Sequence, residues 1–196
     1  MEQQTILFLG PQGCGKGTQL KLLAEHLQKV DPTRTILEPA MGNMLRELSE
    51  RPNYTGRLLK PILAEGKLVE YAISVSVFGN YVFEHMEENQ HLMIDGFPRT
   101  VEQTTLLDSL FRFYNRTNPT IVRIEISDEE ALKRLLGRHR SDDTEESIRT
   151  RLAWSRKSEQ EIKEWANKQG HRFVEINGEH PIEETQRLIR EALNVA

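Results

Sequence analysis

The feature that most constrains this chain is a glycine-rich segment, GPQGCGKGTQ at residues 10–19, directly after an apolar run at residues 5–9. The apolar run predicts a buried strand, and the spacing of Leu20, Leu23 and Leu27 predicts a helix after the glycines. A strand, a glycine-rich turn and a helix in this order are typical of a loop that holds phosphate groups.

The glycine-rich segment fits the pattern Gly-x4-Gly-Lys-[Ser/Thr] with one departure, because Gly17 follows Lys16 and the hydroxyl comes one place later at Thr18. Glycines let backbone N–H groups converge on phosphate oxygens, and the helix N-terminus and the lysine add positive charge. A glycine-rich connection that binds nothing is disfavoured, because every part of the pattern falls in order. We predict a nucleotide polyphosphate site formed by Gly13, Cys14, Gly15, Lys16, Gly17 and Thr18.

The composition argues against several other classes of protein. A chain of 196 residues predicts one compact domain, residues 1–196. The net charge is −4 and the charged residues of both signs are well mixed along the chain, which argues against a nucleic-acid partner. The first residues do not resemble a signal peptide, and no apolar run approaches the roughly 20 residues that a membrane helix needs. Cys14 is the only cysteine, which fits a reducing compartment. We expect a soluble cytoplasmic protein that does not associate with membranes.

Four further apolar runs predict strands, and helical periodicity fills the intervals between them. The runs lie at residues 35–37, 92–94, 121–126 and 173–176, and the longest helix is expected at 143–168. Buried strands that alternate with helices favour a parallel sheet covered on both faces. The predicted fold class is therefore α/β, with three layers around a five-stranded parallel sheet.

The interval between the second and third strands, residues 38–91, is longer than the ~30 residues that a strand–helix–strand unit takes. It reads as three helices, at about 43–50, 55–65 and 70–88. A helical insertion at the carboxyl edge of a parallel sheet lies where ligands bind. By spacing alone, an ordinary helical hairpin without a ligand is equally favoured.

The third predicted strand ends in the sequence DGFPRT at residues 95–100. An acidic residue at this place, Asp95, is suited to hold Mg²⁺ directly or through water, together with the hydroxyl of Thr18. Gly96 permits the close approach of a ligand, and the guanidinium of Arg99 suits a phosphate. Without the glycine-rich segment, this sequence would indicate only a polar turn.

Taken together, these motifs closely resemble the adenylate kinase family of nucleoside monophosphate kinases, in its short-lid form. That family carries Gly-x-Pro-Gly-x-Gly-Lys-Gly-Thr-Gln, so Gly17 becomes a family mark, and it carries Asp-Gly-[Phe/Tyr]-Pro-Arg, matched at 95–99. Pro11-Gln12 stands here in place of the family's x-Pro. The resemblance runs through the whole chain, including Asn177-Gly178, which fits the adenine-contacting loop.

The resemblance implies that residues 40–69 form the monophosphate-binding insertion. Arg46 and Arg99 would grip the AMP phosphate, and Gln103 would read the adenine. Two departures leave the strength of adenine discrimination open, because the family usually has Ser or Thr at Met41 and Asp at Asn43. The implied AMP site consists of Met41, Arg46, Lys67, Leu68, Val69, Gly96, Phe97, Arg99, Gln103, Arg140 and Arg151.

The resemblance also assigns the arginines on either side of a short lid at residues 135–143. Arg134 would stack on the ATP adenine near Gly178, Arg138 would contact ATP phosphates, and Arg140 and Arg151 would span both phosphate chains. The implied catalytic set is Lys16, Arg99, Arg138, Arg140 and Arg151. The lid is too short for an inserted domain, so no structural zinc is expected.

Other residues near the lid receive structural interpretations from the sequence. Asp142 with Glu145 forms a plausible helix cap, although a contact that closes on the ligand is an equal alternative for Asp142 and Asp143. Surface charges and packing residues are expected farther along the longest helix. The charges are Arg149 and Arg156, and the packing residues are Trp154 and Trp165.

The expected activity is Mg·ATP + AMP ⇌ 2 ADP, by direct in-line transfer. No general base is required, because the acceptor phosphate is already ionised. One alternative is a UMP or CMP kinase, favoured by Met41 and opposed by Gln103. Another is a non-catalytic nucleotide-binding protein, which the presence of Lys16, Asp95 and the arginines opposes. Because the family is often monomeric, a monomer is expected.

Overall fold

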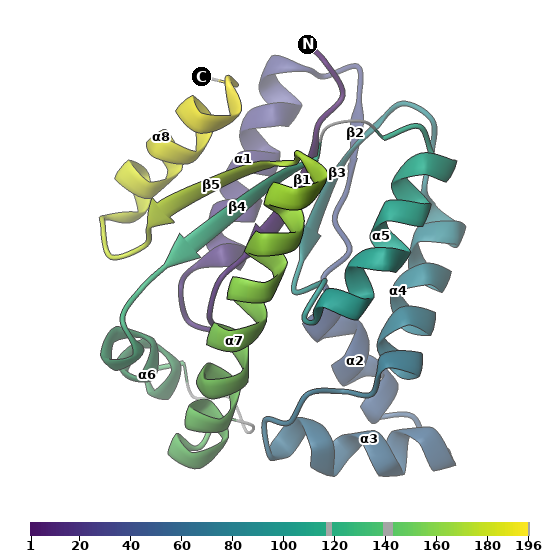
Figure 1. Ribbon diagram of the computed structural model, residues 1–196, viewed down its shortest axis with the longest axis vertical. Helices are drawn as coiled ribbons and strands as arrows, with labels where there is room; N and C mark the ends of the chain where they lie inside the picture. The colour runs from purple at the N-terminus through teal and green to yellow at the C-terminus, as the bar shows by residue number, and fades with distance from the viewer. Residues whose placement is uncertain (117–118, 139–142, 196) are drawn as a thin grey trace.

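The computed structural model describes residues 1–116, 119–138 and 143–195 of the chain, and its core is a five-stranded parallel sheet (Figure 1). The spatial order of the strands is β2-β3-β1-β4-β5. Their bounds are β1 (Thr5–Leu9), β2 (Thr35–Leu37), β3 (Gln90–Asp95), β4 (Thr120–Glu125) and β5 (Arg172–Asn177). The predicted five-stranded parallel sheet is confirmed.

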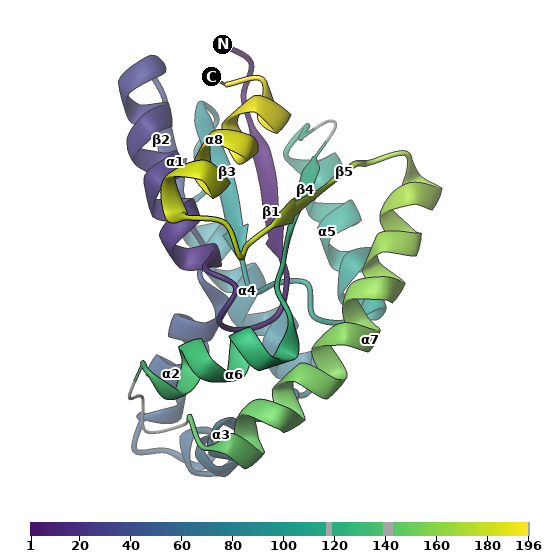
Figure 2. The same cartoon turned by 90° about the vertical axis from the view of Figure 1, so that its left-hand side faces the viewer.

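Helices cover both faces of the sheet, which makes the predicted three layers (Figure 2). One face carries α1 (Lys16–Val30) and α8 (Ile182–Leu193). The other face carries α4 (Tyr71–His85), α5 (Val101–Phe113) and part of α7 (Glu145–Gln169). The remaining helices lie beyond the strand tips, and they are α2 (Met41–Ser49), α3 (Tyr54–Ala64) and α6 (Asp128–Leu136).

The central strand β1 shows how the sequence builds these layers. All five of its residues are buried, and the four apolar ones after Thr5 divide by alternation between the two hydrophobic clusters. Ile6 and Phe8 pack with α1 and α8, whereas Leu7 and Leu9 pack with α4, α5 and α7. A strand buried on both faces needs apolar residues at every position, which is why the run at residues 5–9 is uninterrupted.

The three helices expected between the second and third strands are present as α2, α3 and α4. Asn53 begins α3 as its N-cap, since its side-chain oxygen accepts a 2.8 Å hydrogen bond from the Gly56 N–H. In the described part of the chain, no helix combines the length and the apolar character needed to cross a membrane.

The predicted cap of the longest helix is wrong. Helix α7 begins at Glu145 and is capped by Thr144, not by Asp142, which lies outside the described residues. The Thr144 hydroxyl accepts from the Ser147 N–H at 3.2 Å, and the Ser147 hydroxyl accepts from the Thr144 N–H at 3.1 Å. This reciprocal pair satisfies both N–H groups, so no carboxylate is needed at the helix start.

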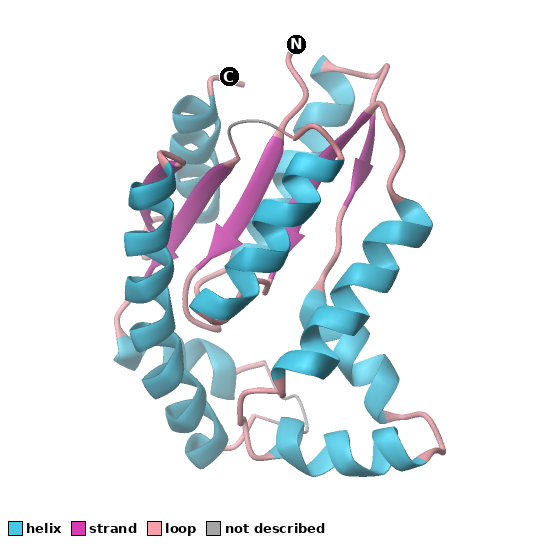
Figure 3. Cartoon of the chain, turned by 45° about the vertical axis from the view of Figure 1, so that its right-hand side comes forward, coloured by secondary structure: helices cyan, strands magenta, loops and turns pink. Residues whose placement is uncertain are grey.

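The topology brings the chemically interesting segments together at one edge. All strand arrows point toward the same end of the molecule, where the carboxyl-terminal loops gather (Figure 3). Phe8 on β1 is the register partner of Asp95 on β3, so the glycine-rich segment leaves the sheet beside Asp95. Asp95 also donates its N–H to the Pro39 carbonyl at 3.1 Å, so the 40–69 insertion starts at the same place.

Candidate active site

The glycine-rich loop connects β1 to α1 and takes a shape that glycine alone allows. Gly10 and Gly15 have φ angles of +135° and +93°, in the region that side chains rarely adopt. A Cβ atom on Gly10 would also overlap the carbonyl oxygen of Ile124 on the neighbouring strand. The loop therefore closes tightly over the strand tips and leaves the first N–H groups of α1 facing outward from the sheet.

Lys16, the first residue of α1, directs its ammonium group back into this loop. The group donates to the carbonyl oxygens of Gly10 and Pro11 at 2.7 and 2.8 Å, and it lies 3.4 Å from the sulfur of Cys14. Only 7% of Lys16 is exposed. A positive charge is thus held inside the loop at the place where a phosphate chain would be bound.

The loop forms one wall of the first pocket of the cleft, the donor pocket, whose other walls come from α2, β3 and α6. Arg134 and Arg138 on the α6 side face the glycines across this pocket. Arg134 donates to Glu130 at 2.7 Å and to the carbonyl oxygen of Gly178 at 3.0 Å, which joins the two residues predicted to contact adenine. The predicted residues that line the donor pocket are Gly13, Gly15, Lys16, Gly17, Thr18, Arg134 and Arg138, whereas Cys14 is buried behind the loop.

Asp95, at the tip of β3, also lines the donor pocket together with Thr18. Its Oδ1 atom is buried and has no hydrogen-bond partner in the described structure. An unsatisfied carboxylate oxygen in a polyanion pocket is a natural ligand for a hard cation or its water shell. Elsewhere, the described residues contain no group of three or more His, Cys, Asp or Glu side chains arranged to hold a metal ion.

The second pocket, the acceptor pocket, has largely apolar walls. Met41 and Phe97 are 3% and 1% exposed, and the Phe97 ring stacks on Phe78 with the centroids 4.2 Å apart. All predicted AMP-binding residues in the described part of the chain line this pocket, and Arg140 lies outside that part. They are Met41, Arg46, Lys67, Leu68, Val69, Gly96, Phe97, Arg99, Gln103 and Arg151.

The two pockets share residues and therefore form one continuous cleft. The shared residues are Gln12, Gly42, Arg46, Gly96 and Arg99. Arg46 donates to the side-chain oxygen of Asn43 at 2.7 Å, and Arg99 donates to the Gly96 carbonyl oxygen at 3.1 Å. Two guanidinium groups thus stand at the boundary between a polyphosphate loop and an apolar pocket.

Asp143 organises two further guanidinium groups. It accepts two hydrogen bonds from Arg138, at 2.9 and 3.1 Å, and one from Arg151 at 2.8 Å. The sequence left Asp143 between capping and contact with a ligand. The structure shows that it does not cap α7 and that it joins Arg138, after α6, to Arg151 on α7, whereas its contact with a ligand stays a prediction.

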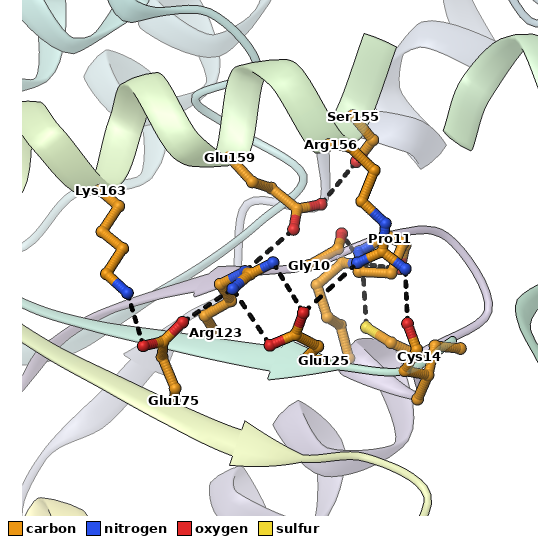
Figure 4. Close-up of polar contacts among 12 residues, drawn as sticks. Gly10, Pro11, Cys14, Arg123, Glu125, Ser155, Arg156, Glu159, Lys163 and Glu175 are labelled. Atoms are coloured by element: carbon orange, nitrogen blue, oxygen red, sulfur yellow. Dashed lines mark hydrogen bonds and ion pairs between the residues drawn. The ribbon is translucent and has the colours of Figure 1, made fainter. Parts of the chain in front are cut away.

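Helix α7 is held against the sheet by a second charged network (Figure 4). Glu159, only 2% exposed, accepts from the Ser155 hydroxyl at 2.6 Å and from Arg123 on β4 at 3.1 Å. Arg156 donates to Asp128 at the start of α6 at 2.7 Å. Arg156 therefore connects α7 to α6, which corrects its interpretation as a solvated surface charge. Among the described residues, Arg149 pairs only with exposed Glu145.

Comparison of the sequence with known proteins identifies a family. A family model described as adenylate kinase fits residues 8–171, which is most of the chain. The chain belongs to the adenylate kinase family. It is 33% identical to an adenylate kinase of Prochlorococcus marinus (strain MIT 9211) over 190 residues, covering 97% of each chain. It is 31% identical to an adenylate kinase of Corynebacterium glutamicum (strain R) over 188 residues, covering 96% of this chain and 98% of that one.

Sequence reasoning missed several residues that line the cleft of this adenylate kinase family member. Trp154 was expected only to pack, but it lines the acceptor pocket, donates to the Gly66 carbonyl oxygen at 2.9 Å and lies 5.7 Å from the Arg99 guanidinium. Its position three residues after Arg151 was the available signal, because such residues share a helix face. Trp165 packs in the core as expected.

Two other missed residues carry no sequence signal of that kind. Gln12 lines both pockets at the place where the adenylate kinase family has proline. Ser74 lines the acceptor pocket from the first turn of α4, a largely apolar helix. Gln12 lies inside the glycine-rich segment, but at a position that the Gly-x4-Gly-Lys pattern leaves unspecified, and Ser74 belongs to no motif.

Proposed function

We propose that this protein catalyses the reversible transfer of a phosphoryl group from ATP to AMP, which produces two molecules of ADP. The observation that carries the proposal is the junction of the two pockets, where Arg46 and Arg99 separate a phosphate loop from an apolar pocket. Such a cleft suits two nucleotides bound with their phosphates toward each other and their bases apart. Membership of the adenylate kinase family supports it.

The donor side would bind ATP through the loop and α6. The N–H groups of residues 13–18 would surround the β- and γ-phosphates, while Lys16 exchanges its two carbonyl partners for phosphate oxygens. Arg134 and Gly178 would hold the adenine. Thr18 and Asp95 would hold Mg²⁺, whose charge neutralises the phosphates when it is bound with ATP.

The acceptor side would bind AMP with its phosphate on Arg46 and Arg99 and its adenosine in the apolar pocket. Met41, Leu68 and Phe97 would pack against the base, because their side chains line that pocket. The remaining residues of the acceptor pocket would contact AMP from the rim of the pocket or beside the adenine base. They are Lys67, Val69, Gly96 and Gln103.

In the reaction, an oxygen of the AMP phosphate forms a bond to the γ-phosphorus of ATP. The bond from the γ-phosphorus to its bridging oxygen breaks at the same time, and ADP leaves with that electron pair. The acceptor oxygen is ionised at neutral pH, so no base takes a proton. Arg138, Arg140 and Arg151 would stabilise the charge on the transferring group, and Asp143 orients two of them beforehand.

We also assign the 40–69 insertion and the 135–143 lid to movable parts of one P-loop kinase domain. The insertion and the described start of the lid, at Leu135 and Arg138, lie at the cleft. The insertion contacts α7 through the hydrogen bond from Trp154 to Gly66, and Asp143, at the other end of the lid, does so through its ion pair with Arg151. The approach of the insertion and the lid over bound nucleotides would exclude water from the transferring group. Exclusion of water matters because water would otherwise compete as the acceptor.

A steady-state assay with Mg·ATP and separate acceptors tests the proposal. We expect turnover with AMP to exceed turnover with UMP, CMP and GMP, and the product of the AMP reaction to be ADP alone. A preference for a pyrimidine nucleotide would contradict the adenylate assignment. Absence of turnover with every acceptor would favour a non-catalytic nucleotide-binding protein.

A further inference from the structure

The acceptor pocket contains two neutral polar side chains that are almost completely buried. They are Gln103 on α5 and Ser74 on α4, with 1% and 4% of each residue exposed. The arginines of the pocket, in contrast, are assigned to the phosphate side of AMP, and its one lysine, Lys67, is exposed. A buried polar atom without a partner is costly, so its orientation indicates what the pocket accepts.

In its present arrangement the hydroxyl of Ser74 offers a ligand an acceptor. Its oxygen lies 3.1 Å from the Glu70 carbonyl oxygen and 3.3 Å from the Val69 carbonyl oxygen. Both neighbours are acceptors, so the hydroxyl hydrogen is directed at one of them. The lone pairs of the Ser74 oxygen remain, and Val69 is itself a lining residue of the same pocket.

The amide of Gln103 is oriented in the opposite sense. Its oxygen accepts a 2.6 Å hydrogen bond from the backbone N–H of Arg99, which identifies that atom as the oxygen because a backbone N–H can only donate. Within the described part of the chain, its NH₂ group donates to no other residue. The pocket therefore offers a donor at Gln103 and an acceptor at Ser74.

Adenine presents the complementary pattern, a ring nitrogen acceptor beside an exocyclic amine donor. Hypoxanthine has the same shape but carries a carbonyl oxygen in place of the amine and an N–H in place of the ring acceptor. We infer that Ser74 is a specificity-determining residue that accepts a hydrogen bond from the exocyclic amine of the acceptor base. This inference rests on the proposed function. The family usually has a hydroxyl at the position of Met41, and Ser74 supplies one from another place in the pocket.

The test compares AMP with IMP, whose base is hypoxanthine. Dissociation constants measured by titration calorimetry give the preference even if IMP is a poor substrate, and kcat/KM for AMP is measured in parallel. In Ser74→Ala the preference for AMP over IMP should fall about tenfold, as expected for one lost hydrogen bond. The fall should come chiefly from weaker AMP binding, with the ATP dissociation constant unchanged.

Two further variants separate hydrogen bonding from packing. Ser74→Cys fills nearly the same space with a weak acceptor, so it should lose the preference as Ser74→Ala does, and it serves if the alanine variant does not fold. Ser49→Ala is the matched control. Ser49 is 7% exposed and donates to its own helix at Arg46 O, but it does not line the pocket. The preference of Ser49→Ala for AMP over IMP should equal that of the unaltered protein.

Each outcome bears on a different statement. Equal weakening of AMP and IMP in both Ser74 variants, or an unchanged preference, would overturn the role of Ser74. If the unaltered protein transfers no phosphoryl group to AMP, the proposed function fails first. An active protein whose Ser74 variants keep the preference leaves the proposed function intact and removes only this inference.

Discussion

The carboxylate of Asp143 lies 2.8 Å from a terminal nitrogen of Arg151, and the two side chains are 1% and 5% exposed. The same carboxylate accepts from Arg138 at the end of α6. One buried anion thus sets the direction of two guanidinium groups, one from the turn after α6 and one from α7. Their alignment does not depend on the arginines alone.

Asp143→Asn should therefore lower kcat by about ten- to a hundredfold, because misdirected arginines stabilise the transferring group poorly. It should also lower the free energy of unfolding by roughly 3 kcal/mol, since a buried ion pair loses one partner. Steady-state kinetics and urea unfolding measure the two effects. Glu145→Gln, which breaks only an exposed pair with Arg149, is the control and should change neither. A normal kcat in Asp143→Asn would refute the orienting role.

Lys16→Met should reduce kcat by about a hundred- to a thousandfold, because a positive charge next to the transferring group is lost. The fold should persist, since the methionine chain can occupy the same channel in the loop. Circular dichroism checks the fold, and the coupled assay checks the rate. Lys21→Met, an exposed change on the same helix, should remain active. Substantial turnover in Lys16→Met would contradict the assigned role.

Trp154 should report AMP binding by fluorescence, because it lines the acceptor pocket beside Arg99, whereas Trp165 lies in the core. AMP should change the emission of the unaltered protein and of Trp165→Phe, but not that of Trp154→Phe. An AMP-dependent signal that survives in Trp154→Phe would show that AMP binds elsewhere or acts on the core.

His91 should make the stability of the fold depend on pH. It is fully buried on β3, and its Nδ1 accepts a 3.1 Å hydrogen bond from the Gln4 N–H, which requires the neutral ring. Burial lowers its pKa below the ordinary value of 6.5, although nearby Asp31 acts in the opposite direction.

The sign of this dependence follows from proton linkage. Below pH 6.5 the unfolded chain binds a proton at His91 before the folded chain does, so the free energy of unfolding decreases as the pH falls. The contribution of the neutral His91 side chain to the free energy of unfolding is fully present above pH 6.5. Urea unfolding at pH 7.5 and 5.5 should show this loss, and His91→Gln should show a smaller one. An equal loss in both proteins would assign the effect to other groups.

Much of the fold could be predicted from the sequence because its central strands β1, β3 and β4 are buried along most of their length. Such strands appear as short apolar runs, and the glycine-rich loop marks where the first of them ends. The bounds of α7 were harder to predict. The N-cap Thr144 pairs with Ser147 three residues later, where the usual capping box has Glu or Gln. The prediction therefore chose Asp142, which has Glu145 three residues later, and placed the cap two residues too early.

The predicted residues of the cleft came from linear motifs, whereas the missed ones depend on contacts between distant segments. Asp143 looks like a cap until α6 is placed beside α7. Ser74 looks like an interruption of an apolar helix until its neighbours in space are known. A sequence gives the chemical groups, but the direction of a hydroxyl or a carboxylate is decided by the carbonyls and guanidinium groups around it.

The complete burial of β1 has a consequence for motion. The phosphate loop is attached to the most enclosed strand of the molecule, so displacing it as a unit would require opening both hydrophobic clusters. Slow exchange of amide hydrogens is therefore expected along β1, with faster exchange in α3 and at the start of α7. Substitutions confined to exposed residues of α3, such as Tyr54 and Leu58, should therefore alter the opening of the cleft without changing the global unfolding transition, because they leave both clusters around β1 intact.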